Sequence, residues 1–150
     1  MPAFPMQLAG FSAGSKLDIV NGSFRGIGFG GRAKVVKFEP DALELDLRVT
    51  KLLFHIDVVL RFHTLPDGTL SFFGGRPDGK TTGREPAHVQ HTMTVKSQTP
   101  DRTVFEFEML EKGVNVVKQV SLEKRRTQKG NDSLHLTYER IEMTLAPTSH

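Results

Sequence analysis

The sequence predicts an all-β fold, an antiparallel up-and-down meander of about nine or ten strands. Three observations predict it. Apolar residues recur at every second position along most of the chain, which is the period of a strand. Short polar turns separate the alternating runs, and Leu65-Pro66-Asp67-Gly68-Thr69 is the clearest of them. No segment carries an apolar stripe of helical period with start and stop signals.

The alternation is most regular in the middle of the chain. From Leu43 to Val49 the odd-numbered residues are apolar, and from Leu52 to Phe62 the even-numbered ones are. A shift of one residue sends every side chain to the opposite face of a sheet, so we expect a tight turn or a bulge near residues 50–51. Further strands are expected at 16–20, 23–29, 33–38, 69–73, 89–95, 105–109 and 114–122, and a last one at 134–138, after which the parity slips, to 141–145.

So many strands form one domain, residues 1–150, in which residues 1–15 are an irregular N-terminal strap. The strands must protect their edges, either in a closed or strongly curved barrel or in a two-layer sandwich. Short connections between consecutive strands favour a barrel or half-barrel, and the β-sandwich is the alternative. The strand number and alternation resemble the calycin-like barrels, which bind small apolar molecules inside. The chain lacks the tryptophan motif of lipocalins and the helical lid of the fatty-acid-binding group, so we assign it to no family.

Composition excludes several functions. Twenty Lys and Arg against seventeen Asp and Glu leave a net charge of +3, which is too small to demand a nucleic-acid partner. The basic cluster Lys124–Arg126 with Lys129 has no aromatic residues interleaved for base stacking, so we expect a solvated hairpin tip. The absence of cysteine excludes disulfides, thiolate metal sites and a cysteine nucleophile. No apolar run is long enough to span a membrane and no signal peptide is evident, so we expect a cytoplasmic chain or a mature exported form.

Two patterns that resemble cofactor sites have simpler explanations. The run Gly26-Ile27-Gly28-Phe29-Gly30-Gly31 has dinucleotide-fingerprint spacing, but a strand rather than a helix follows it, so we expect the glycines to permit a bend or a close approach. A metal site would need histidines that converge on one point, and a trio such as His55, His91 and His135 has no support in the sequence. We therefore predict no cofactor and no metal.

The predicted inner face is rich in phenylalanine, which supplies apolar area without a polar group that needs a partner. Such a wall suits a dry core and a lipid pocket equally. The residues expected along it are Phe54, Ile56, Val58, Phe62, Phe72, Phe105 and Phe107.

Cations interrupt this apolar pattern at two places. Lys118 lies in the row Val114, Val116, Val120 and Leu122, and Arg140 extends the row that ends at Tyr138. At the inner face of a barrel, Lys118, Tyr138 and Arg140 would suit the head group of an acid. A local bulge, or a lysine that reaches the rim, is the alternative explanation.

The most polar strand face carries His55, Asp57, Arg61 and His63. Such a face usually meets solvent. If it were concave instead, His55 could act as a base and Asp57 could orient it.

Three hypotheses follow for function. The first is a binding module that holds a small apolar or amphipathic ligand inside the barrel. The second is an interaction protein with a filled core, which works through an exposed edge or the strap Phe4–Phe11 and could form a homodimer. The third is a small cavity enzyme of the isomerase or cyclase type that uses His55 and Asp57.

Overall fold

The ten strands follow one another along the chain. The computed structural model describes residues 7–67, 69–75, 88–126 and 130–148, and for residues 88–92 and 109–111 it describes the backbone alone. The strands are β1 (Lys16–Phe24), β2 (Ile27–Glu39), β3 (Ala42–Lys51), β4 (Phe54–Thr64), β5 (Leu70–Gly75), β6 (His88–Gln98), β7 (Arg102–Glu111), β8 (Val114–Arg126), β9 (Asp132–Tyr138) and β10 (Ile141–Pro147).

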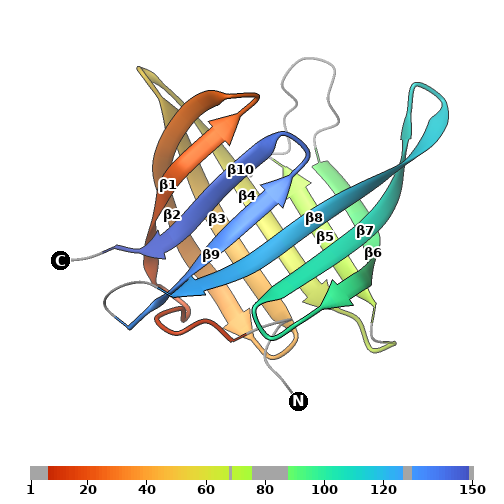
Figure 1. The fold of residues 1–150 in the computed structure, drawn as a ribbon, viewed down its shortest axis with the longest axis horizontal. Coiled ribbons are helices and arrows are strands. Elements are labelled where there is room, and N and C mark those ends of the chain that lie inside the picture. The colour runs from red at the N-terminus through yellow and green to blue at the C-terminus, as the bar shows by residue number, and fades with distance from the viewer. Residues whose placement is uncertain (1–6, 68, 76–87, 127–129, 149–150) are drawn as a thin grey trace.

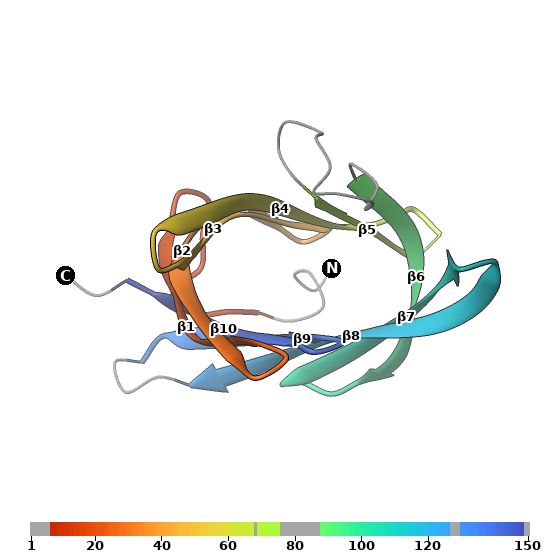
Figure 2. The ribbon, with the colours of Figure 1, turned by 90° about the horizontal axis from the view of Figure 1, so that it is seen from above.

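The strands close into a barrel. Each strand pairs antiparallel with the next one in the chain, and β1 pairs with β10 to complete the circle. The predicted all-β meander is therefore confirmed, as a closed barrel rather than a sandwich. Seen from above, the barrel is flattened, with β3 and β4 on one long side and β8, β9 and β10 on the other (Figures 1 and 2).

The first three predicted strands are in fact two long ones. β1 and β2 meet in a turn at Arg25 and Gly26, whose φ angles are 53° and 82°. The pairing register of β1 shifts between Val20 and Ser23, which interrupts the alternation without ending the strand. A bulge of this kind adds an unpaired residue and re-aims the side chains that follow. In this region the alternation therefore indicated three strands where the backbone forms two.

The parity change near residue 50 is a hairpin turn, as predicted, but it lies slightly later. β3 ends at Lys51 and β4 begins at Phe54, so Leu52 and Leu53 form the tip. Leu52 has a φ angle of 54°, a left-handed conformation that is uncommon for leucine.

The glycine run has a structural role. β2 continues as a strand through the run, so no helix begins there to meet a pyrophosphate. Gly31 has a φ angle of 140°, and a Cβ atom at this position would lie 2.0 Å from the carbonyl oxygen of Arg48 on β3. Only glycine permits such an approach, which agrees with the predicted close contact.

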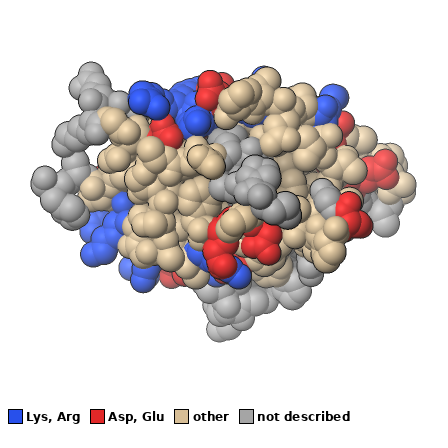
Figure 3. Space-filling view, turned by 90° about the horizontal axis from the view of Figure 1, so that it is seen from below, with Lys and Arg blue, Asp and Glu red and all other residues tan. Residues whose placement is uncertain are grey.

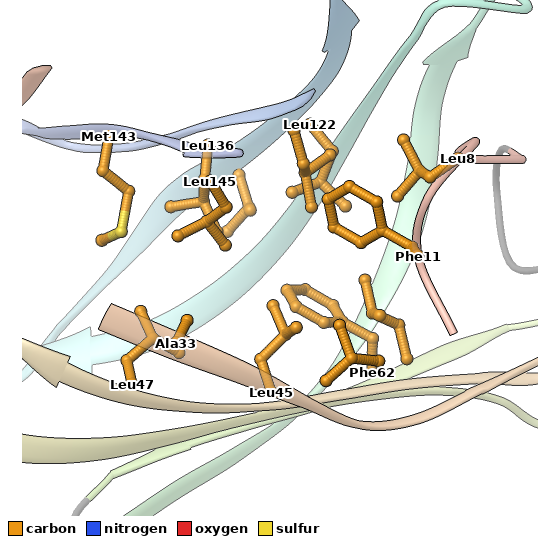
Figure 4. Packing of buried hydrophobic residues seen from close by; sticks show 14 of the residues in the cluster. Leu8, Phe11, Ala33, Leu45, Leu47, Phe62, Leu122, Leu136, Met143 and Leu145 are labelled. Carbon is orange, nitrogen blue, oxygen red and sulfur yellow. The ribbon is translucent and has the colours of Figure 1, made fainter. Parts of the chain in front are cut away.

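The N-terminal strap closes one end of the barrel. Leu8 and Phe11 are buried, and the ring of Phe11 meets that of Phe38 edge to face at 6.4 Å. Ala9 and Asp132 hold the strap in place, because the Ala9 N–H donates to the Asp132 carboxylate (2.7 Å) and the Asp132 N–H donates to the Ala9 carbonyl (2.8 Å). Figure 4 shows Leu8 and Phe11 pointing toward the leucines of the core.

This arrangement corrects one expectation. Each of the ten strands has two neighbours, so no described strand is an edge strand along its whole length. The pairing of β6 with β7 covers only residues 94–98 and 103–106, so a short stretch of each strand has no paired residue on the other. The strap residues Leu8 and Phe11 are also covered, while Phe4 lies outside the described residues. The second hypothesis therefore loses the Leu8 and Phe11 surface of the strap, and the sheet edge that it needs is reduced to short stretches such as the end of β7 beyond residue 106.

Candidate functional site

The candidate site lies at the end of the barrel opposite the strap, which we call the open end. In an up-and-down barrel the turns β1–β2, β3–β4, β7–β8 and β9–β10 all lie at the same end, and here that end faces away from the strap (Figure 1). Figure 2 looks into this end. Among the described residues, the strap covers one end of the barrel and no comparable segment covers the other.

The predicted ligand-contact residues differ in exposure, from fully buried in the core to largely exposed at the open end. Phe62, Phe105 and Phe107 are buried in the core cluster, whereas Phe72 and Val58 are half-buried against it. Further along β4, Ile56 and Phe54 are 45% and 75% exposed. Burial thus divides the seven residues, because three rings pack in the core and the other four lie toward the open end.

A row of aromatic rings crosses the barrel at the boundary between these halves. Phe62 and Phe72 lie 5.1 Å apart, Phe72 and Phe107 6.3 Å, and Phe107 stacks on Tyr138 at 6.1 Å with an interplanar angle of 16°. Contacts of this length and orientation are favourable for aromatic pairs. One step toward the open end from Phe62 lies Leu60, which is half-buried.

Lys118 lies on the inner side of β8, as the row predicts, and is 9% exposed. It pairs in regular register with Phe107 on β7, so no bulge turns it outward. Its Nζ lies 2.5 Å from Oε1 of Glu139. β9 ends at Tyr138, which pairs with Val120 of β8. Lys118 lies two residues beyond this pair toward the open end, so it is level with the β9–β10 turn, which carries Glu139.

Arg140 does not extend the inner row. It is exposed in the β9–β10 turn, where its carbonyl accepts a hydrogen bond from the Arg25 N–H at 3.1 Å. The two-residue turn at Glu139 and Arg140 ends the alternation after Tyr138, which is why the predicted inward position is wrong. Glu139, which the sequence analysis did not select, supplies the charge beside Lys118 instead.

A solvent-open hollow of about 330 Å³ adjoins this ion pair. Its lining residues are Arg102, Val117, Lys118, Gln119, Ser121, Thr137 and Glu139. Val117, Gln119 and Ser121 alternate along β8 with the inward Lys118, Val120 and Leu122, so the hollow lies on the outer side of the barrel wall, beside Lys118 and Glu139. The other polar residues of the hollow come from three strands, and only the strand register brings them together.

A second hollow, of about 360 Å³, lies at the strap end beside the predicted basic cluster. Its lining includes Lys124, Arg126 and Asp132. Arg125 hydrogen-bonds to Glu123 and lowers the pKa of that carboxyl. Seen from the strap end, Lys and Arg gather mainly on the left and Asp and Glu mainly at the centre and right (Figure 3). This surface mixes both signs of charge, as a solvated hairpin region does.

The polar face of β4 points outward. Asp57 pairs with Arg48 at 2.9 Å, and Arg61 pairs with Asp46 at 2.9 Å, in both cases across β3 and β4. Asp57 also raises the pKa of Arg48, chiefly through its hydrogen bond. His55 is exposed on the same face. The arrangement that the third hypothesis required, with His55 and Asp57 in a cavity, is therefore wrong.

The histidines do not converge on a metal site in the described part of the chain. His135 is buried and hydrogen-bonds with Thr144 (2.8 Å) and Glu142 (2.9 Å), on a different side of the barrel from His55. The side chain of His91 lies outside the described residues. Among the residues that are described, no three His, Cys, Asp or Glu side chains are grouped to hold a metal ion.

No protein family, no curated protein and no solved structure matches the chain. Across residues 7–67, 69–75, 88–126 and 130–148, no helix is long and apolar enough to cross a membrane.

Proposed function

We propose that this chain binds a small amphipathic molecule at the open end of its barrel, with an anionic head group at Lys118 and an apolar tail along the inner wall. One observation carries the proposal. Lys118 is buried in an otherwise apolar inner row at the boundary between the packed core and the open end, and it pairs there with the partly exposed Glu139.

The ion pair has a cost that folding alone does not explain. Replacing a buried ion pair by apolar residues of similar volume is often neutral or stabilising, by about 1–4 kcal/mol. Glu139 also holds a left-handed backbone conformation, with a φ angle of 56°, which costs a non-glycine residue about 1–2 kcal/mol. An aliphatic residue at position 118 would serve a dry core better. A lysine at this place is useful if it meets an anion.

The pair can open to admit a ligand. The Glu139 side chain is 42% exposed, so its carboxylate can move into water while Lys118 stays in the wall. A carboxylate or phosphate from the ligand would then take its place against the ammonium group. A charged hydrogen bond of this kind contributes about 1.5–3 kcal/mol.

The tail would follow the half-buried residues of the inner wall. Val58, Leu60 and Phe72 lead from the aromatic row toward Ile56 and Phe54 at the open end. Each methylene group that leaves water there would contribute about 0.8 kcal/mol. We therefore expect affinity to rise with the length of the tail until the tail reaches the rim.

A fluorescence titration with cis-parinaric acid, a long-chain fatty acid, tests the proposal. Purified protein is first extracted with organic solvent, and native mass spectrometry checks that no molecule remains bound. We expect Lys118→Met to weaken binding about tenfold or more, the loss of one charged hydrogen bond. Lys34→Met is the matched control, because Lys34 is exposed on β2.

Two results would overturn the proposal. One is a wild-type protein that does not bind the fatty acid. The other is equal weakening by Lys118→Met of a fatty acid and of the fatty alcohol of the same length, because the head-group charge would then be irrelevant.

An interaction protein with a filled core is the second candidate. One observation favours it, namely that the core cluster joins residues from most strands and from the strap in continuous contact (Figure 4). This candidate predicts no ligand in the titration and a defined oligomer, such as a homodimer, by native mass spectrometry.

A further inference from the structure

The open end carries most of the exposed large apolar side chains among the described residues. Eleven such residues are exposed, and eight of them lie at this end. Six of the eight form what we call the apolar rim, at the tips of three hairpins: Phe24, Ile27, Leu52, Leu53, Phe54 and Val114. Single exposed apolar residues are ordinary on protein surfaces, but a concentration at one end indicates an interaction site.

The β3–β4 tip is the clearest part of the rim. Leu52, Leu53 and Phe54 are 86%, 96% and 75% exposed in succession. Leu52 also holds its left-handed backbone at a position where glycine or asparagine would be favoured. The tip therefore combines exposed apolar surface with backbone strain, and neither of these features stabilises the folded chain.

Cations accompany the apolar residues at each tip. Arg25 lies between Phe24 and Ile27 with its guanidinium 5.3 Å from the Phe24 ring, Lys51 precedes Leu52, and Lys112 lies two residues before Val114. Arg140 lies in the fourth described turn. Glu139, the acidic residue of that turn, is paired with Lys118. The β1–β2 and β3–β4 tips are thus apolar and positively charged together, whereas at the β7–β8 tip Glu111 directly precedes Lys112.

The combination of exposed apolar and basic side chains indicates which kind of partner the open end would bind. The rim residues stand on separate hairpin tips (Figure 1) rather than on one flat face, so they suit insertion into a soft surface. Long basic side chains can extend from apolar surroundings to a polar boundary, and anionic head groups attract them. We propose that the open end docks on the surface of an anionic lipid bilayer, with the apolar rim among the lipids and Arg25, Lys51 and Lys112 against the head groups.

The inference goes beyond the proposed function and does not depend on Lys118. It places the mouth of the proposed ligand site on the bilayer, from which an amphipathic molecule could enter without crossing water.

Vesicle flotation with the full, ligand-free chain tests the proposal. We expect binding to phosphatidylcholine vesicles that contain about 30% phosphatidylserine, weak binding to pure phosphatidylcholine, and loss of binding in 1 M salt, where the Debye length is about 3 Å. Replacing Leu53 and Phe54 by serine should weaken binding about tenfold or more. Replacing Val36 and Val95, which are exposed but lie toward the strap end, by serine is the matched control and should leave binding unchanged.

The charge contribution is tested separately. Arg25→Gln and Lys51→Gln should each weaken binding to the anionic vesicles about fivefold, the loss expected for one cation near such a surface. Lys16→Gln and Lys34→Gln, at exposed positions on the strands, are the controls.

A fluorescent reporter gives a second measurement, because the chain contains no tryptophan. Leu53→Trp introduces one at the rim, and its emission should shift to shorter wavelength when anionic vesicles are added. Val36→Trp, on the outer face, should show no shift.

Three outcomes would overturn the docking proposal. They are no flotation of the wild type with anionic vesicles, flotation that survives the Leu53 and Phe54 substitutions, or a dimer in sedimentation that those substitutions dissociate without any vesicle binding. The last outcome would assign the rim to a second copy of the chain. A protein that binds vesicles but not cis-parinaric acid would support docking and contradict the proposed function, and the reverse result would do the opposite.

Discussion

The two ends of this barrel differ in whether their apolar side chains are buried or exposed. At the strap end, Leu8 and Phe11 fold over the lumen and the Ala9–Asp132 hydrogen bonds fasten them. At the open end, Leu53 and Phe54 stand in solvent at a hairpin tip. Residues of the same chemical type are thus covered at one end and displayed at the other.

This difference indicates that the exposed apolar side chains at the open end contribute little to the free energy of folding. Burial of apolar surface supplies the main favourable contribution to folding, and an exposed leucine or phenylalanine supplies almost none of it. The strap end should therefore respond to substitution through stability, and the open end through binding. The expected effects below run from the largest to the smallest.

A matched pair of phenylalanines tests the contrast directly. Phe11→Ala removes a buried ring, so it should lower the free energy of unfolding by about 3 kcal/mol or more. Phe54→Ala removes an exposed ring and should change that free energy by less than about 0.5 kcal/mol. Urea denaturation of both variants measures the difference. Equal destabilisation would show that the rim is part of the core.

The hydrogen bonds of the strap should give the next largest effect. Asp132 is buried and its carboxylate accepts the Ala9 N–H, so Asp132→Ala should destabilise the fold by about 2 kcal/mol. Asp132→Asn keeps an acceptor oxygen and should cost less. Hydrogen exchange of the Ala9 amide should speed up in the alanine variant, and unchanged exchange would contradict the assigned bond.

The ion pair at the boundary should respond asymmetrically. Glu139→Gln leaves Lys118 buried without its carboxylate and should destabilise by about 1–2 kcal/mol, less than for a fully buried pair because Glu139 is 42% exposed. Lys118→Met should be neutral or slightly stabilising, since methionine fits the apolar row. Chemical denaturation measures both. A large loss from Lys118→Met would give the lysine a structural role and weaken the proposed function.

The smallest expected effect is a gain. Leu52→Gly relieves the left-handed backbone at the β3–β4 tip and should raise the free energy of unfolding by about 0.5–1 kcal/mol. The same variant should bind anionic vesicles less well, because the tip loses an exposed apolar side chain. Leu53→Gly, at the neighbouring tip position, should weaken vesicle binding without the gain in stability.

Much of the fold could be predicted because the alternation of apolar residues reports the two faces of a strand directly. The row containing Lys118 was placed correctly on the inner side of β8, since β8 pairs with β7 in unbroken register. The prediction failed where a local event broke the period. A bulge in β1 and the turn at Arg25 and Gly26 divided the expected strand 23–29 between β1 and β2, and the β9–β10 turn carried Arg140 away from the inner row.

The candidate site could be predicted only in part. The apolar residues of β4 were selected by their period, but the period gives no information about position along the barrel axis. It could not separate Phe62, which is in the core, from Phe54, which is on the rim. Glu139 was missed because it lies beside Lys118 only through the point at which β9 ends relative to β8. Strand alternation gives no information about where one strand ends relative to its neighbour.

By itself the sequence determined the fold class, the strand faces and the position of the β4 residues that point outward, because side-chain alternation is a local property of each strand. Only the tertiary structure decided that the sheet closes, that the strap covers one end and that the other end displays the apolar rim. Closure, register and the ends of a barrel depend on contacts between residues far apart in the chain, which no local pattern records.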